Sequence, residues 1–96
     1  MQQNKFQKIN VTALFSNFKM QGVSRRITPV TFQLKSGEKF EVSEIRRSYV
    51  EHVGDTQHVH FVVHTKQGRY FDIVYDSKKM GWTLVLELDD GFMTDD

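Results

Sequence analysis

The stretch that decides the fold reads His58-Val59-His60-Phe61-Val62-Val63-His64-Thr65. Within it, Val59, Phe61 and Val63 recur at every second position, which is typical of a β-strand with one buried face. The opposite face carries three of the four histidines in the chain. Because histidine titrates near neutral pH and is the commonest metal ligand, that face is the first candidate for chemistry.

A hairpin is expected to follow this strand across Lys66-Gln67-Gly68. A two-residue turn would place Asp72 opposite the core residue Val63, whereas a three-residue loop places Phe71 there. Strand register follows the apolar face, so we predict the three-residue loop, with Gly68 at the position that needs a positive φ. The expected apolar pairs are Val63 with Phe71, Phe61 with Ile73, and Val59 with Tyr75.

A second hairpin is expected to turn at about Ser77-Lys78-Lys79-Met80. The residues after it again alternate, which indicates a third strand. Its expected pairs are Tyr75 with Trp82, Ile73 with Leu84, and Phe71 with Leu86. The carboxyl half is therefore predicted as a three-stranded meander with one continuous face of large apolar side chains.

Residues 30–34 and 38–50 are predicted as two earlier strands joined by a glycine-containing turn. On the first strand, the residues predicted to share the apolar face are Val30, Phe32 and Leu34. On the second strand the apolar parity slips, which predicts a β-bulge near Ser43-Glu44. Residues 51–57 read as a loop.

Residues 8–15 are predicted as a further strand, in which Ile9, Val11, Ala13 and Phe15 alternate along one face. A single sheet would leave its apolar face exposed to water. The strands predicted before the meander must therefore cover that face. We therefore predict a mainly β fold. It is a small antiparallel, partly open barrel or sandwich of five to six strands, with a carboxyl-terminal three-stranded meander.

The chain of 96 residues is expected to form a single domain, 1–96, with frayed ends at 1–7 and 89–96. Hydrophobic residues make up 39% and charged residues 26%, which is a globular composition. The lack of cysteine excludes disulfides, thiolate chemistry and Cys-ligated zinc. No signal-peptide core and no membrane-spanning apolar run are present, so we expect a bacterial or phage cytoplasmic protein with no membrane partner.

Charge is distributed unevenly although the formal net charge is only +1. Residues 1–37 contain six Lys or Arg and no acid, whereas residues 87–96 contain five Asp or Glu and no base. The two segments can attract one another, or the front can form a basic binding face beside a solubilising acidic segment. Exposed charge that is merely solvated is the simpler interpretation.

One pattern of β-core residues runs through residues 28–86. It reads Pro29-Val30-x-Phe32, Gly37, Phe40-x-Val42, Phe61-x-Val63-x-Thr65-x-x-Gly68-x-x-Phe71-x-Ile73-x-Tyr75-Asp76 and Trp82-x-Leu84. This spacing resembles a family of small uncharacterised bacterial β domains, a domain of unknown function. The resemblance implies a small β fold and no activity. Leu34 stands where that family usually has Trp, and Gly37-Glu38 where it usually has Gly-Arg, so a Trp–Arg surface is missing.

The hairpin register also predicts the polar neighbours of the histidine face. It sets His58 opposite Asp76, His60 opposite Val74, Val62 opposite Asp72, and His64 opposite Tyr70. Candidate metal ligands are His58, His60, Asp72 and Asp76, since two histidines with a facing carboxylate can chelate Zn²⁺, Ni²⁺ or Fe²⁺. Solvated cross-strand pairs are the simpler interpretation. No catalytic residue and no cofactor are assigned, because no nucleophile or phosphate-binding motif is present.

The histidine-bearing face of the meander is more apolar than a fully solvent-exposed surface needs to be. Its apolar members are Val62, Tyr70, Val74 and Val85. Either the amino-terminal segment covers them or a partner does, whether a different protein or a second copy.

Nucleic-acid binding is the alternative, because small β barrels bind single strands through basic grooves and stacked aromatics. Its candidate residues are Lys19, Arg25, Arg26, Arg46, Arg47, Lys78 and Lys79, with Phe15, Phe18 and Tyr49 as stacking partners. However, Phe15 and Phe18 are expected in the core, and the sequence pI of about 8.0 is below that of typical nucleic-acid-binding domains. The chain is thus predicted to be a non-enzymatic protein-interaction module, with nucleic-acid binding second and a His/Asp metal site or enzyme third.

Overall fold

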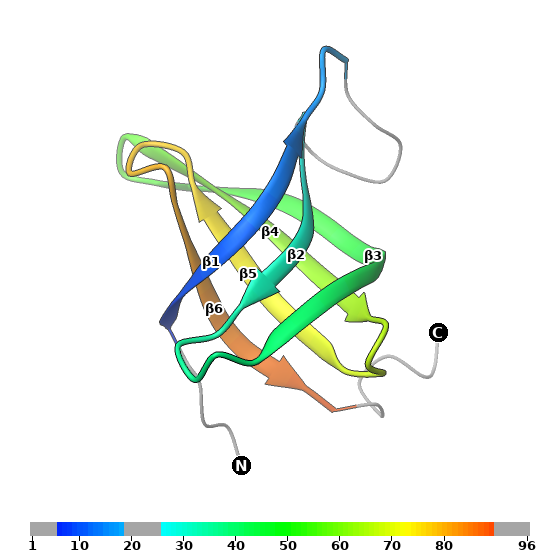
Figure 1. Ribbon diagram of the computed structural model, residues 1–96. Helices are drawn as coiled ribbons and strands as arrows, with labels where there is room; N and C mark the ends of the chain where they lie inside the picture. The colour runs from blue at the N-terminus through cyan, green and yellow to red at the C-terminus, as the bar shows by residue number, and fades with distance from the viewer. Residues whose placement is uncertain (1–5, 19–25, 90–96) are drawn as a thin grey trace.

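The computed structural model describes residues 6–18 and 26–89, which form a closed antiparallel β barrel (Figure 1). Each strand pairs with the next one along the chain, and the last strand pairs back with the first. The strands are β1 (Gln7–Phe15), β2 (Ile27–Gln33), β3 (Lys39–Val53), β4 (Thr56–Thr65), β5 (Tyr70–Asp76) and β6 (Gly81–Leu88). No helix in the described ranges could span a membrane. The predicted small antiparallel barrel is confirmed, although it is closed rather than partly open.

The hairpin of β4 and β5 has the predicted register. Val63 pairs with Phe71, and Phe61 pairs with Ile73. Gly68 has the expected positive φ of 84°, and its amide donates to the Thr65 carbonyl at 2.9 Å. The apolar alternation and one glycine therefore sufficed to predict this hairpin.

The next hairpin, of β5 and β6, follows the prediction only as far as its middle. Ile73 pairs with Leu84 as expected, but Phe71 pairs with Glu87 and not with Leu86. The register shifts because Val85 is an extra residue on β6, a β-bulge. The shift brings Glu87 into contact with Arg69, whose Nε lies 2.8 Å from Glu87 Oε2.

Strand β3 is longer than predicted and is irregular. The expected bulge is confirmed at Ser43, and a second one occurs at Arg46. The predicted loop over residues 51–57 is wrong, since Val53 pairs with Thr56 and only Gly54 and Asp55 form the turn. Polar side chains do not prevent strand pairing here because this part of the hairpin is largely exposed.

Strand β2 corrects the predicted apolar face of residues 30–34. Val30 is 43% exposed, whereas Pro29 and Phe32 are buried. The cause is a register shift against β1, in which Thr12 pairs with Thr31 but Ala13 pairs with Pro29. Val30 is therefore an extra, bulged residue that points outward.

Strand β1 confirms the predicted strand but not the burial of its last residue. Ile9 is buried, whereas Phe15 is 67% exposed. β1 pairs with β6 only through Gln7–Ile9, so its distal half runs past β6. Gln7, predicted to be in a frayed end, pairs with Leu84, while residues 1–5 and 90–96 lie outside the described residues.

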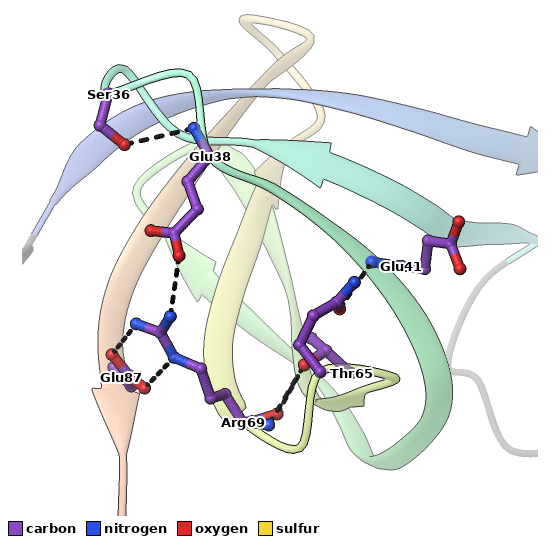
Figure 2. Close-up of polar contacts among 7 residues, drawn as sticks. Ser36, Glu38, Glu41, Thr65, Arg69 and Glu87 are labelled. Carbon is purple, nitrogen blue, oxygen red and sulfur yellow. Dashed lines mark hydrogen bonds and ion pairs between the residues drawn. The ribbon is translucent and has the colours of Figure 1, made fainter.

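One end of the barrel, which we call the Arg69 end, is closed by a network of ion pairs (Figure 2). The guanidinium of Arg69 makes two parallel contacts with Glu87, at 2.8 and 2.9 Å, and one with Glu38 at 3.0 Å. It also lies over the rings of Phe40 and Phe71, at 4.9 and 5.4 Å from their centres. Arg69 thereby joins the β2–β3 turn, the β4–β5 turn and β6 over the end of the core.

Candidate functional site

The opposite end of the barrel, which we call the pocket end, contains a pocket of about 480 Å³. Its lining comes from the end of β1, the beginning of β2, the start of β4 and the end of β5. Its lining residues are Phe15, Ser16, Asn17, Arg26, Ile27, Gln57, Val59, Tyr75 and Ser77. The volume falls within the range of about 300–1,000 Å³ that is usual for ligand pockets.

An aromatic series leads from the rim of this pocket into the core. The ring of Phe15 meets Tyr75 edge-on at 6.5 Å, Tyr75 lies 5.0 Å from Trp82, and Trp82 lies 5.7 Å from the buried ring of Phe61. Phe15 stays 67% exposed because β1 carries it past the last core layer. An exposed aromatic ring on a rigid support is typical of a binding surface.

Positive charge lies beside this aromatic rim. Arg26 Nη1 donates to the Asn17 carbonyl at 2.6 Å, and the Arg26 carbonyl accepts from the Ser16 amide at 2.8 Å. These bonds hold Arg26 in the pocket wall, and no carboxylate of the described residues pairs with it. The β5–β6 turn adds Lys79, whose ammonium has no ion-pair partner in the described part of the chain.

The carboxylate of Asp76, at the end of β5, is already hydrogen-bonded within the protein. Asp76 accepts from the backbone amides of Lys78 and Lys79 and from the hydroxyl of Thr56, at 2.9 to 3.0 Å. The Lys79 amide bond contributes most to lowering the pKa of Asp76 below its usual value. Lys78 in turn pairs with Asp55 at 2.9 Å. Arg26 is therefore the charged side chain among the described residues of the pocket lining, and Lys79 lies on the adjoining β5–β6 turn.

Of the seven predicted nucleic-acid-binding cations, the five that lie in the described residues do not form one patch. Arg26, Lys78 and Lys79 lie at the pocket end. Arg46 pairs with Glu44 at 3.4 Å where β3 bends, and Arg47 lies over the ring of Tyr49 at 5.3 Å. The remaining two, Lys19 and Arg25, lie outside the described residues.

The four predicted metal ligands divide into two pairs. His58 Nε2 lies 3.2 Å from Asp76 Oδ2, and His60 Nδ1 lies 3.5 Å from Asp72 Oδ1. The other nitrogen of His60 faces Glu51, at 3.0 Å from its Oε1. Within the described residues, no group of three or more His, Asp or Glu side chains is arranged to hold a metal ion.

The His60 pair is a structural feature of the outer face of β3, β4 and β5. The imidazole stacks on Tyr49 with ring centres 4.5 Å apart and planes 5° apart. Burial raises the pKa of Asp72, against the lowering effect of the neighbouring His60. His60 Nδ1 and Asp72 Oδ1 are both buried and face one another at 3.5 Å, and among the described residues neither atom has a second hydrogen-bond partner. Tyr49 and Glu51 were missed as neighbours of His60, because two bulges set the register of β3.

The predicted partner face lies on this same outer surface. Val62 is only 4% exposed although it points away from the core cluster. Its companions Tyr70, Val74 and Val85 are half-buried. His64 lies against Tyr70, as predicted, with ring centres 4.5 Å apart. Neighbouring side chains thus already cover much of this face.

The pocket itself was not predicted from the sequence. Phe15 was expected in the core, because strand alternation does not reveal that β1 outruns its neighbour β6. The polar pair Ser16-Asn17 directly after Phe15 is the one local sign that the strand ends there. Comparison of the chain with protein-family models, with curated proteins and with solved structures finds no match.

Proposed function

We propose that this chain is a non-enzymatic protein-interaction module that binds its partner at the pocket end. The observation that carries the proposal is the exposed Phe15 ring beside Arg26, on a pocket that opens toward the core. None of the described residues that line this pocket is a His, Asp or Glu. Binding is therefore supported better than acid–base catalysis, which needs such a group within reach of the substrate.

The chemistry of the pocket defines the segment that fits it. Phe15, Ile27 and Tyr75 offer apolar surface for one bulky side chain. Arg26 and Lys79 attract a carboxylate beside that side chain. The pocket is therefore suited to an extended protein segment with a large apolar residue next to Asp or Glu.

A single-stranded nucleic acid is the second candidate, since Phe15 and Arg26 could also hold a base and a phosphate. It is less favoured because Arg46 and Arg47 lie elsewhere and Lys78 is paired with Asp55. Fluorescence anisotropy with labelled single-stranded DNA and RNA at low salt tests it. Binding that strengthens as salt falls, and that is lost on Arg26→Glu, would replace the protein partner by a nucleic acid.

Selection from a random peptide display library tests the protein-interaction proposal. We expect enriched peptides to contain an aromatic or large aliphatic residue flanked by Asp or Glu. Phe15→Ser should weaken the selected peptides at least about tenfold, the size of a typical hot-spot effect. Phe6→Ser is the matched control, because Phe6 is 72% exposed at the other end of β1. Equal loss in both variants, or no enrichment, would refute the proposal.

The family resemblance, the bacterial source and the cytoplasmic location of this chain are also proposals. The resemblance to small uncharacterised bacterial β domains is supported by the β-core positions it shares with this barrel. The proposed bacterial source is supported by the same resemblance. The cytoplasmic location is supported by the lack of cysteine, which fits a reducing compartment.

A further inference from the structure

The chain itself contains a segment with the chemistry that the pocket end fits. It reads Asp89-Asp90-Gly91-Phe92-Met93-Thr94-Asp95-Asp96. Two large apolar residues stand between two pairs of carboxylates, with no Lys or Arg among them. Apart from Asp89, this segment lies outside the described residues. Its composition matches an apolar pocket with a positive rim.

We infer that the Phe92-Met93 segment of one copy docks into the pocket end of a second copy, so that chains associate head to tail. The inference rests on the proposed function, because it uses the same pocket. Phe92 fills the space beside Phe15 and Tyr75. The flanking aspartates face Arg26 and Lys79.

The topology of the barrel places this contact between two copies and not within one. Strand β6 begins at Gly81, which pairs with Asp76 beside the pocket, and ends at Leu88 toward the Arg69 end. Seven residue steps span about 23 Å at about 3.3 Å per residue. Phe92 lies four residues beyond Leu88, a reach of at most about 14 Å. A segment of that length cannot return along the barrel wall and over the rim of its own pocket.

The charge distribution favours the same pairing. Residues 89–96 contain four acids and no base, whereas Arg26 in the pocket wall has no carboxylate partner among the described residues. An acidic segment of one copy is therefore attracted to the cation in the pocket wall of another copy. The contact joins two different surfaces, so it is heterologous and allows chains longer than a dimer.

Sedimentation velocity of the full chain tests the inference by complementation. The intact chain should show a mass that rises with concentration up to about 1 mM and falls toward the monomer as salt screens the charges. Phe92→Ser removes the docking residue, and Phe15→Ser with Arg26→Glu removes the pocket surface. Each variant alone should stay monomeric, whereas a mixture of the two should form a 1:1 complex. Phe6→Ser should associate like the intact chain.

The possible outcomes separate this inference from the proposed function. A mixture that stays monomeric while the intact chain associates would show a different contact and overturn the inference. An intact chain that is monomeric at every concentration would also overturn it, while selected peptides that still bind at Phe15 would leave the proposed function standing. Far-ultraviolet circular dichroism of each variant checks that the barrel is folded.

Discussion

At the scale of single residues, two histidines on one strand face differ in their surroundings. His58 meets Asp76, a carboxylate that backbone amides of its own turn already hold. His60 lies between Glu51 and Asp72, with one ring nitrogen facing each carboxylate. The sequence predicted the Asp76 contact through the hairpin register. It could not predict Glu51, because that contact depends on two bulges in β3.

Replacing Asp72 tests whether its buried carboxylate, beside His60, destabilises the fold. Burial raises the pKa of Asp72 in the folded state, so its ionised form opposes folding at neutral pH. We expect Asp72→Asn to raise the free energy of unfolding at pH 7 by up to about 1 kcal/mol. The gain should shrink as the pH falls and Asp72 in the intact chain becomes protonated. Urea unfolding at a series of pH values measures it. A clear loss of stability at pH 7 would contradict this assignment.

Replacing Arg69 tests the network that closes the other end. Arg69→Gln leaves Glu87 and Glu38 without their cation and removes the contact with Phe40. We expect it to lower the free energy of unfolding by about 1–2 kcal/mol at pH 7. Arg69 lowers the pKa of Glu87, so this contribution is present above the usual glutamate pKa and lost as the pH falls through the lowered one.

The control for Arg69 is an exposed pair on the same barrel. Lys66 lies 3.5 Å from Glu41, and both side chains are more than half exposed. Lys66→Gln should change the free energy of unfolding by no more than about 0.5 kcal/mol. If the urea midpoints of the two variants shift equally, the Arg69 network has no special role in closing the barrel.

At the scale of elements, the sequence predicts strands and tight turns better than it predicts irregular pairing. The alternation in β4 and the position of Gly68 fixed one complete hairpin. The bulges at Val30, Arg46 and Val85 were not predicted. A bulge adds one residue to a strand, and its position depends on pairing with the neighbouring strand more than on local composition. The unexpected exposure of Phe15 has the same origin, since it depends on how far β1 extends past β6.

The β4–β5 turn gives a direct test at this scale. Gly68 has a φ of 84°, a conformation that side chains other than glycine rarely adopt. We expect Gly68→Ala to cost about 1 kcal/mol or somewhat more. Gly81→Ala is the control, because Gly81 does not have a positive φ and a Cβ there meets no atom within 4 Å. Thermal unfolding that shows equal losses for both would contradict the assigned turn.

At the scale of the whole molecule, the two ends of the barrel are built differently. The Arg69 end is held by paired charges over buried phenylalanine rings. The pocket end leaves Phe15 exposed beside a cation that has no acidic partner among the described residues. Charged groups that stabilise a fold are paired in this way, whereas unpaired charge beside apolar surface is typical of recognition. We therefore place binding at the pocket end.

Amide chemical-shift mapping tests that placement most directly. A selected apolar–acidic peptide is titrated into the ¹⁵N-labelled chain, and the amides whose resonances move are assigned. We expect these amides to cluster at the pocket end, around Phe15–Asn17, Gln57 and Ser77, and we expect Phe15→Ser to abolish the shifts. Shifts confined to the outer face around His60 and Val74, with the pocket amides unmoved, would contradict it.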